Sequence, residues 1–248
     1  PRLAVLDTGF APPAGLAGLA AGTLDASDPG CPISDPDGHG TAMALLASGL
    51  LPADGFSSGG EAERILAVKM NDEAGVTSAF ALLLSLAYAA ENGAKVVNMS
   101  WGCDADSTAL SAAIAQATHD GMLLVAAAGN EGAAALTYPA AYESVLAVAG
   151  TAGGQPWSGS NRGGGVALAS EVFATTLAPD GTPARIAGTS ISAATVSGAL
   201  AAWWAEHPDA TGEQARAALF SSLSPPAGEG FGAGTFDEAA RERLLTAE

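Results

Sequence analysis

The segment "KVVNMSWGCDADSTALSAAIAQATHDGMLLVAAAG", residues 95–129, decides the fold class because two apolar runs flank a helical pattern. Each run is short and has the length of a buried strand. Between the runs, Leu110, Ile114 and Ala117 recur at steps of three and four residues, which predicts one buried helix face. Asp120-Gly121 then provides a stop signal. The segment therefore predicts a strand, a helix and a second strand in succession.

The same alternation continues along the rest of the chain. Near-continuous apolar strands that alternate with helices predict a mostly parallel sheet covered by helices on both faces. We predict one α/β domain of three layers over residues 1–248, with residues 10–34 weakly structured. Further strands are expected at 2–7, 64–70 and 144–150, and further helices at 42–51, at 79–91 and from Ser190 onward. In the 79–91 helix, the side chains expected to face the core are Phe80, Leu83, Leu84 and Ala87.

Composition excludes several classes of function. The 248 residues are 48% hydrophobic, which is enough for a large core. A net charge of −17 with nine basic residues argues against nucleic acid as a partner. The apolar runs are too short to span a bilayer, so no membrane span is expected. The chain starts directly in a strand, so we expect any targeting or pro-segment to lie outside it. Cys31 and Cys103 leave open either one disulfide or two free thiols.

Small and polar residues follow three of the predicted strands. These strand ends are Asp7-Thr8-Gly9, Ser100-Trp101-Gly102 and Gly129-Asn130. In open parallel sheets, functional groups gather at the carboxyl ends of the strands. We therefore expect the three segments to meet at one edge of the sheet.

Ser190, in "AGTSISAATVSG" at 187–198, is a helix-capping residue or a nucleophile. A nucleophilic serine needs a base, a carboxylate that orients the base, and donors for the oxyanion. His39 lies between two glycines at the start of a predicted helix and is the candidate base. Asp7 and Asn130 supply the other two groups, so the four residues together favour nucleophilic catalysis.

Six blocks carry a resemblance to a known family: "AVLDTG", "DGHGTAMA", "VVNMSWG", "AAAGNEG", "YPAAYESVLAVAG" and "GTSISAATVSG". In this order, between residues 4 and 198, they resemble the signature blocks of the subtilisin-like serine proteases, the subtilases. The resemblance implies a serine endopeptidase that hydrolyses peptide bonds through an acyl-enzyme. A pepsin-type protease would need a second Asp loop, and an α/β-hydrolase would need a second glycine in the nucleophile block.

The resemblance also implies a role for each candidate. The order Asp, His, Ser is that of subtilisin. Ser190 would be the nucleophile and the helix cap at one position. His39 would be the general base and then the acid, and Asp7 would orient its ring. The side chain of Asn130 and the Ser190 N–H would form the oxyanion hole.

Substrate-binding residues follow from the same blocks. Ser100, Trp101 and Gly102 would form an edge segment on which a peptide lies as an added strand. Gly129 and Glu131 would border the main specificity pocket. Two preferences stay open, for large apolar side chains or for basic ones. The acidic residues that would favour basic substrates are Glu131, Asp35, Asp37, Asp72, Glu73, Asp104 and Asp106.

Departures from the family pattern concern packing and substrate fit. Leu45 replaces a customary glycine, and Ala169-Ser170-Glu171 replaces a customary Ala-Pro-Gly. Two alternative functions remain: a transpeptidase or cyclase with the same triad, and a peptide-binding relative that does not cleave.

Catalysis by this group of residues needs no cofactor or metal. The family's high-affinity calcium site is expected to be absent, because 11–16 holds no carboxylate and 47–56 only Asp54. The expected partner is a peptide or protein substrate, and the resemblance adds a propeptide or a protein inhibitor. It also favours a secreted or periplasmic location.

Overall fold

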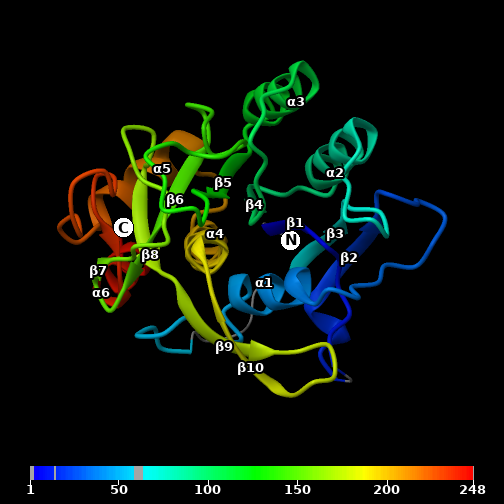
Figure 1. Ribbon diagram of the computed structural model, residues 1–248, viewed down its shortest axis with the longest axis horizontal. Coiled ribbons are helices and arrows are strands. Elements are labelled where there is room, and N and C mark those ends of the chain that lie inside the picture. The colour runs from blue at the N-terminus through cyan, green and yellow to red at the C-terminus, as the bar shows by residue number, and fades with distance from the viewer. Residues whose placement is uncertain (1–2, 14, 59–63, 248) are drawn as a thin grey trace.

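A parallel sheet forms the centre of the computed structural model, which describes residues 3–13, 15–58 and 64–247. The strand order is β11-β8-β6-β5-β4-β1-β3-β2, and β7 pairs with β6. Only this last pair in the sheet is antiparallel. Helices lie on both faces (Figure 1), which confirms the α/β, three-layer prediction.

The strands and helices have the following bounds. The strands are β1 (Leu3–Asp7), β2 (Ala20–Asp25), β3 (Ile65–Lys69), β4 (Val96–Met99), β5 (Leu123–Ala127), β6 (Leu146–Ala152), β7 (Gln155–Pro156), β8 (Leu168–Glu171), β9 (Phe173–Leu177), β10 (Pro183–Ala187) and β11 (Thr235–Phe236). The helices are a short 3-10 helix (Ala17–Leu19), α1 (His39–Ala47), α2 (Ala79–Glu91), α3 (Thr108–His119), α4 (Thr189–Glu206), α5 (Gly212–Ser222) and α6 (Glu238–Leu245). Within the described ranges, none of these helices combines the length and the apolar composition needed to cross a membrane.

The segment 95–129 forms the expected strand–helix–strand unit, β4–α3–β5. Ser107 is the N-cap of α3, and its Oγ accepts the N–H of Leu110 at 3.1 Å. Leu110, Ile114 and Ala117 are all at most 5% exposed. The two strands pair in parallel, with Val96 opposite Leu123. The local pattern therefore predicted this unit correctly.

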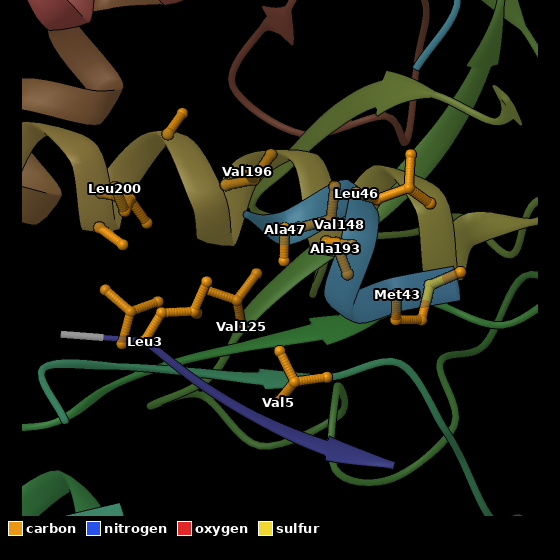
Figure 2. Packing of buried hydrophobic residues seen from close by; sticks show 14 of the residues in the cluster. Leu3, Val5, Met43, Leu46, Ala47, Val125, Val148, Ala193, Val196 and Leu200 are labelled. Carbon is orange, nitrogen blue, oxygen red and sulfur yellow. The ribbon is translucent and has the colours of Figure 1, made fainter. Parts of the chain in front are cut away.

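Helices α1 and α4 pack together on one face of the sheet. Figure 2 shows Val196 and Leu200 of α4 and Met43 of α1 above Leu3 and Val5 of β1. The two helices approach closely at Gly198, where a Cβ would lie 2.2 Å from the Ala47 carbonyl oxygen. Leu45, in place of the customary glycine, is fully buried in this core. Burying a Leu or Val side chain contributes about 1.5–3 kcal/mol, so this layer fixes the position of the α4 N-terminus.

Helices α2 and α3 cover the opposite face, and here the prediction for α2 is wrong for three of its four residues. Phe80 is 65% exposed and Leu83 49% exposed, Ala87 is also exposed, and Leu84 is half-buried against the core. The buried residues of α2 are Ala81, Leu82, Ser85, Leu86 and Ala89. Apolar residues surround this helix on all sides, so periodicity alone does not select a face. The small side chains at 81, 85 and 89 allow the helix to approach the sheet.

Residues 10–34 contain a strand that was not expected. β2 pairs in parallel with β3 at one end of the sheet, with a register irregularity between Ala20 and Gly22. Its sequence, "AAGTLD", begins with two alanines and a glycine, and Thr23 is its one β-branched residue. We infer that β2 forms because the edge of β3 offers backbone hydrogen bonds, and not because its own residues favour a strand. A further hairpin, β9–β10, extends from the sheet beside α1 (Figure 1).

Candidate active site

Three strand ends meet at one edge of the sheet, as expected from the topology. Asp7 is the last residue of β1, Ser100 follows β4, and Asn130 lies three residues past β5. β4 pairs with both β1 and β5. The N-termini of α1 and α4 reach the same edge and bring His39 and Ser190 to it.

His39 and Asp7 are paired directly. His39 Nδ1 lies 2.6 Å from Asp7 Oδ1, so the Nε2 edge of the ring faces away from the carboxylate. The same oxygen accepts the Thr8 N–H at 2.8 Å. Burial alone would lower the pKa of His39, but the Asp7 carboxylate outweighs it, and Asp37 and Asp35 add to the effect. The pKa of His39 is raised to about 9. The neutral ring required of a base therefore forms at alkaline pH.

The glycines on either side of His39 have separate roles. Gly38 is the N-cap of α1 and has a φ of +85°, a left-handed conformation that favours glycine. Gly40 packs on the strand end, where a Cβ would lie 2.4 Å from the Gly9 carbonyl oxygen. The absence of a side chain at Gly40 therefore permits the close approach of α1 to the end of β1.

Asp35 is part of the framework that holds His39, which corrects its expected place on the substrate cleft. It is 4% exposed. Its Oδ1 accepts the Thr8 hydroxyl at 2.7 Å and the Gly38 N–H at 3.1 Å. Its Oδ2 accepts the N–H and the hydroxyl of Thr41, at 2.7 and 2.6 Å. Asp35 thus links the residue after Asp7 to the first turn of α1.

Ser190 is the second residue of α4, and the N-cap is Gly188. The expectation that the cap and the nucleophile share one position is therefore wrong. The Ser190 Oγ donates to the Ser100 carbonyl oxygen at 3.0 Å. Within the described residues, no acceptor is found for the Ser190 N–H, whereas Thr189 N donates to Asn130 and Ile191 N to Gly188. A free N–H at a helix N-terminus is available to an oxyanion.

A buried network supports Ser190 from below, and the sequence interpretation missed it. Ser100 Oγ donates to the Ser190 carbonyl oxygen at 2.9 Å and accepts from Asn98 Nδ2 at 2.9 Å. Ser197 Oγ donates to Asn98 Oδ1 at 3.1 Å. Asn98 within an apolar strand was the available signal, because a buried amide needs partners.

Asn130 is held so that its amide nitrogen is free. Its Oδ1 accepts the N–H of Thr189 at 2.9 Å and the Thr189 hydroxyl at 3.0 Å. Because a backbone N–H can only donate, it fixes which amide atom is oxygen. The Nδ2 group then points away from Thr189. The side chain of Asn130 is exposed and borders the same cavity as Ser190.

His39 lies between two cavities. The first, of about 480 Å³, is also bordered by Asn130, Ser190 and the β9–β10 hairpin. The second, of about 360 Å³, is bordered by Asp7, Trp101, Gly102 and residues of α2 and α3. Trp101 and Gly102 lie outside any strand. The arrangement is an open groove, with His39 near its middle.

Three of the acidic residues that were expected near the substrate accept hydrogen bonds from groups within the protein. Glu131 Oε2 accepts Asn161 Nδ2 at 2.6 Å. The Asp106 carboxylate accepts the Tyr142 hydroxyl. Asp37 is exposed and accepts the His39 N–H at 3.1 Å. Asp35 is buried, whereas these three carboxylates accept hydrogen bonds from neutral groups and keep their charge, so the two substrate preferences both stay predictions.

Cys31 and Cys103 are both free and exposed. Of the two alternatives left open by the sequence, the structure therefore has two free thiols and not a disulfide. Cys103 borders the smaller cavity together with Asp7 and His39. Cys31 lies in the loop before the His39 turn, and its thiol is 3.1 Å from Asp28 Oδ2.

Adding EDTA is expected to leave the melting temperature unchanged. Across 3–13, 15–58 and 64–247, no three His, Cys, Asp or Glu side chains are grouped so as to hold a metal ion. Asp54 is paired with Arg185 and is not free to bind calcium. Calcium requires six or more oxygen ligands. Thermal denaturation with and without chelator checks this, and a large fall in melting temperature would contradict it.

Comparison of the sequence with known proteins supports this assignment of the fold. Residues 1–238 match the family described as "Subtilase family". The chain is 36% identical over 150 residues to alkaline elastase YaB of Bacillus sp. (strain YaB), covering 60% of this chain and 39% of the elastase. It is 33% identical over 220 residues to subtilisin Savinase of Lederbergia lenta, covering 87% of this chain and 80% of that protein. The alignment with the elastase thus spans well under half of that relative's length.

A solved structure extends the comparison to three dimensions. The crystal structure of MycP1 with its N-terminal propeptide removed superposes with a TM-score of 0.79 at 30% identity. The match covers 99% of this chain and 90% of that one. The similarity therefore includes the whole described fold.

Proposed function

The chain belongs to the subtilase family of serine proteases, and on that basis we propose that it is an endopeptidase in which Ser190, His39 and Asp7 form the catalytic triad. The observation that carries the assignment is the Asp7–His39 pair, which leaves Nε2 of the ring on the cavity that Ser190 and Asn130 also border. That arrangement supplies a base, its orienting carboxylate and a nucleophile around one space.

The first step is activation of Ser190. Its hydroxyl turns from the Ser100 carbonyl toward His39 Nε2, which accepts the proton as Oγ attacks the scissile carbonyl carbon. The Asp7 carboxylate stabilises the imidazolium that forms. His39 then gives this proton to the leaving amine, which leaves an acyl group on Ser190. Water, deprotonated by His39, attacks the acyl carbonyl carbon. The bond to Ser190 Oγ then breaks, His39 gives the proton to Oγ, and the acyl group leaves as a carboxylic acid.

The oxyanion of each tetrahedral intermediate is stabilised by two donors. One is the Ser190 N–H at the start of α4, and the other is Nδ2 of Asn130. Both are free of acceptors among the described residues. Because the donors are held before reaction, they need little reorganisation when charge develops.

The Asn130→Ala variant is expected to lower kcat by about 10²–10³, the range known for loss of this donor in subtilisin itself. The remaining donor and the triad would sustain the residual rate. Steady-state kinetics on a peptide ester or amide would measure the change. A kcat equal to that of the parent would mean that the oxyanion is stabilised by other groups.

The substrate is a peptide that lies along residues 100–102 as an added strand. Trp101 and Gly102 make no backbone hydrogen bonds within the described residues, so their polar groups are open to a partner. A substrate N–H that bonds to the Ser100 carbonyl would also release the Ser190 hydroxyl from it. Gly129 and Glu131 border the site of the residue before the scissile bond.

Labelling by a fluorophosphonate tests the assignment. The expected result is a single modified residue, Ser190, identified by peptide mapping. Product analysis in the presence of an added amine then separates hydrolysis from transfer of the acyl group. Labelling of another serine would overturn the triad.

We further infer that residues 1–248 make up one peptidase domain, since the family match extends over 1–238 without interruption. A propeptide or protein inhibitor is a candidate partner for the groove. MycP1, whose crystal structure was solved with the N-terminal propeptide removed, is a similar protein that has a propeptide. The family resemblance favours a secreted or periplasmic location.

A further inference from the structure

Asn161 lies outside every block that pointed to catalysis, yet it holds the loop that carries Asn130. It is 1% exposed. Its Oδ1 accepts the N–H groups of Glu131 and Ala133, at 3.1 and 2.9 Å. Its Nδ2 donates to Glu131 Oε2 at 2.6 Å, and its own N–H donates to the Gly129 carbonyl at 3.0 Å. The residues on both sides of Asn130 are therefore bonded to one buried residue, Gly129 to its backbone N–H and Glu131 to its side chain.

Neighbouring hydrogen bonds and close packing hold Asn161 in place. Ser160 Oγ accepts the Gly150 N–H at 2.8 Å and donates to the Asn161 carbonyl at 2.8 Å. A Cβ on Gly129 would lie 2.2 Å from Asn161 Nδ2. No space remains for the loop to shift toward Asn161. These contacts thus connect Gly150 in β6, through Ser160 and Asn161, to the loop at residues 129–133 that carries Asn130.

We propose that Asn161 is a positioning residue that sets the direction of the Asn130 amide toward the oxyanion. The proposal rests on the function proposed above. Thr189 fixes the Asn130 side chain from the α4 side, and Asn161 fixes its backbone from the opposite side. An error of about 1 Å in such a group can cost roughly 10² in rate.

The chemistry of the side chain explains why an amide is required. One oxygen accepts two N–H groups while the nitrogen donates to a carboxylate. Alanine would leave two N–H groups without an acceptor. Aspartate would keep the acceptor but place a second carboxylate against Glu131, where like charges repel. Arg162, the next residue in the chain, donates through Nη1 to the Gly132 carbonyl at 2.9 Å.

The test compares five variants with the parent on an uncharged peptide substrate, and rates are expressed per folded protein measured by circular dichroism. Asn161→Ala is expected to lower kcat by roughly 10², with KM little changed. Asn161→Asp is expected to be slow at alkaline pH. Its rate relative to the parent at the same pH should rise as pH falls, because the carboxyl pair takes up a proton and regains a hydrogen bond. His39 titrates in both proteins, so this ratio removes its effect.

A reversed pair provides the decisive variant. In Asn161→Asp/Glu131→Gln the glutamine donates to the aspartate, so kcat should return to within a few-fold of Glu131→Gln alone. Asp237→Ala, which removes the N-cap of α6, controls for a loss of stability away from the loop. Parental kcat in Asn161→Ala, or no recovery in the reversed pair, would overturn the proposal. Failure of the proposed function would instead appear as a parent that neither cleaves peptides nor labels at Ser190.

Discussion

The Ser190→Ala variant is expected to lose about 10⁶ in kcat, the loss that subtilisin itself shows when its nucleophilic serine is removed. In the proposed mechanism the hydroxyl oxygen forms the acyl-enzyme, and Ser190 is the one serine that borders this cavity among the described residues. The fold should survive, because Ser190 is only partly buried and its Oγ makes one hydrogen bond, to Ser100. Kinetics together with thermal denaturation measure both effects.

Ser192→Ala is the matched control for this prediction. Ser192 lies two residues further along α4, is fully buried, and donates to the carbonyls of Ser170 and Glu171. Its loss should lower the melting temperature while fluorophosphonate labelling at Ser190 persists. Normal turnover in Ser190→Ala, or loss of labelling only in Ser192→Ala, would place the nucleophile elsewhere.

The Asp7→Asn variant is expected to lose about 10⁴ in kcat, because an amide cannot hold His39 in the tautomer that leaves Nε2 as an acceptor. The 2.6 Å contact between Nδ1 and Oδ1 is the interaction that fixes this tautomer. The Asp37→Asn variant is the control. Asp37 accepts the backbone N–H of His39. Its charge also raises the pKa of His39, so kcat should change little when the proteins are compared above that pKa of about 9, where the ring is neutral.

The same pair determines the pH dependence. In the parent, kcat/KM should fall as pH drops through the pKa of His39, about 9, because protonation removes the base. In Asp7→Asn this fall in kcat/KM should occur at a lower pH. A raised histidine pKa stabilises the fold fully below the ordinary value of 6.5 and loses that contribution as pH rises through about 9. An unchanged acid limb in Asp7→Asn would contradict this account.

The sequence determined the features that depend on local pattern. The β4–α3–β5 unit followed from apolar periodicity and a polar helix start. The order of the strand ends brought Asp7, Ser100 and Asn130 to one edge, because parallel strands share their carboxyl ends. The family resemblance followed from six short blocks that keep their order.

Tertiary structure alone decided the features that depend on distant partners. The buried face of α2 is selected by the sheet, since its apolar residues surround the helix and Phe80 points to solvent. Ser190 donates to a carbonyl 90 residues away, and Asn161 holds a loop about 30 residues earlier. Asp35 proved to be a buried anchor rather than a surface charge. Apolar periodicity in the sequence predicts only whether a residue is buried. The role of a polar side chain depends on which hydrogen-bonding atoms the folded chain places beside it.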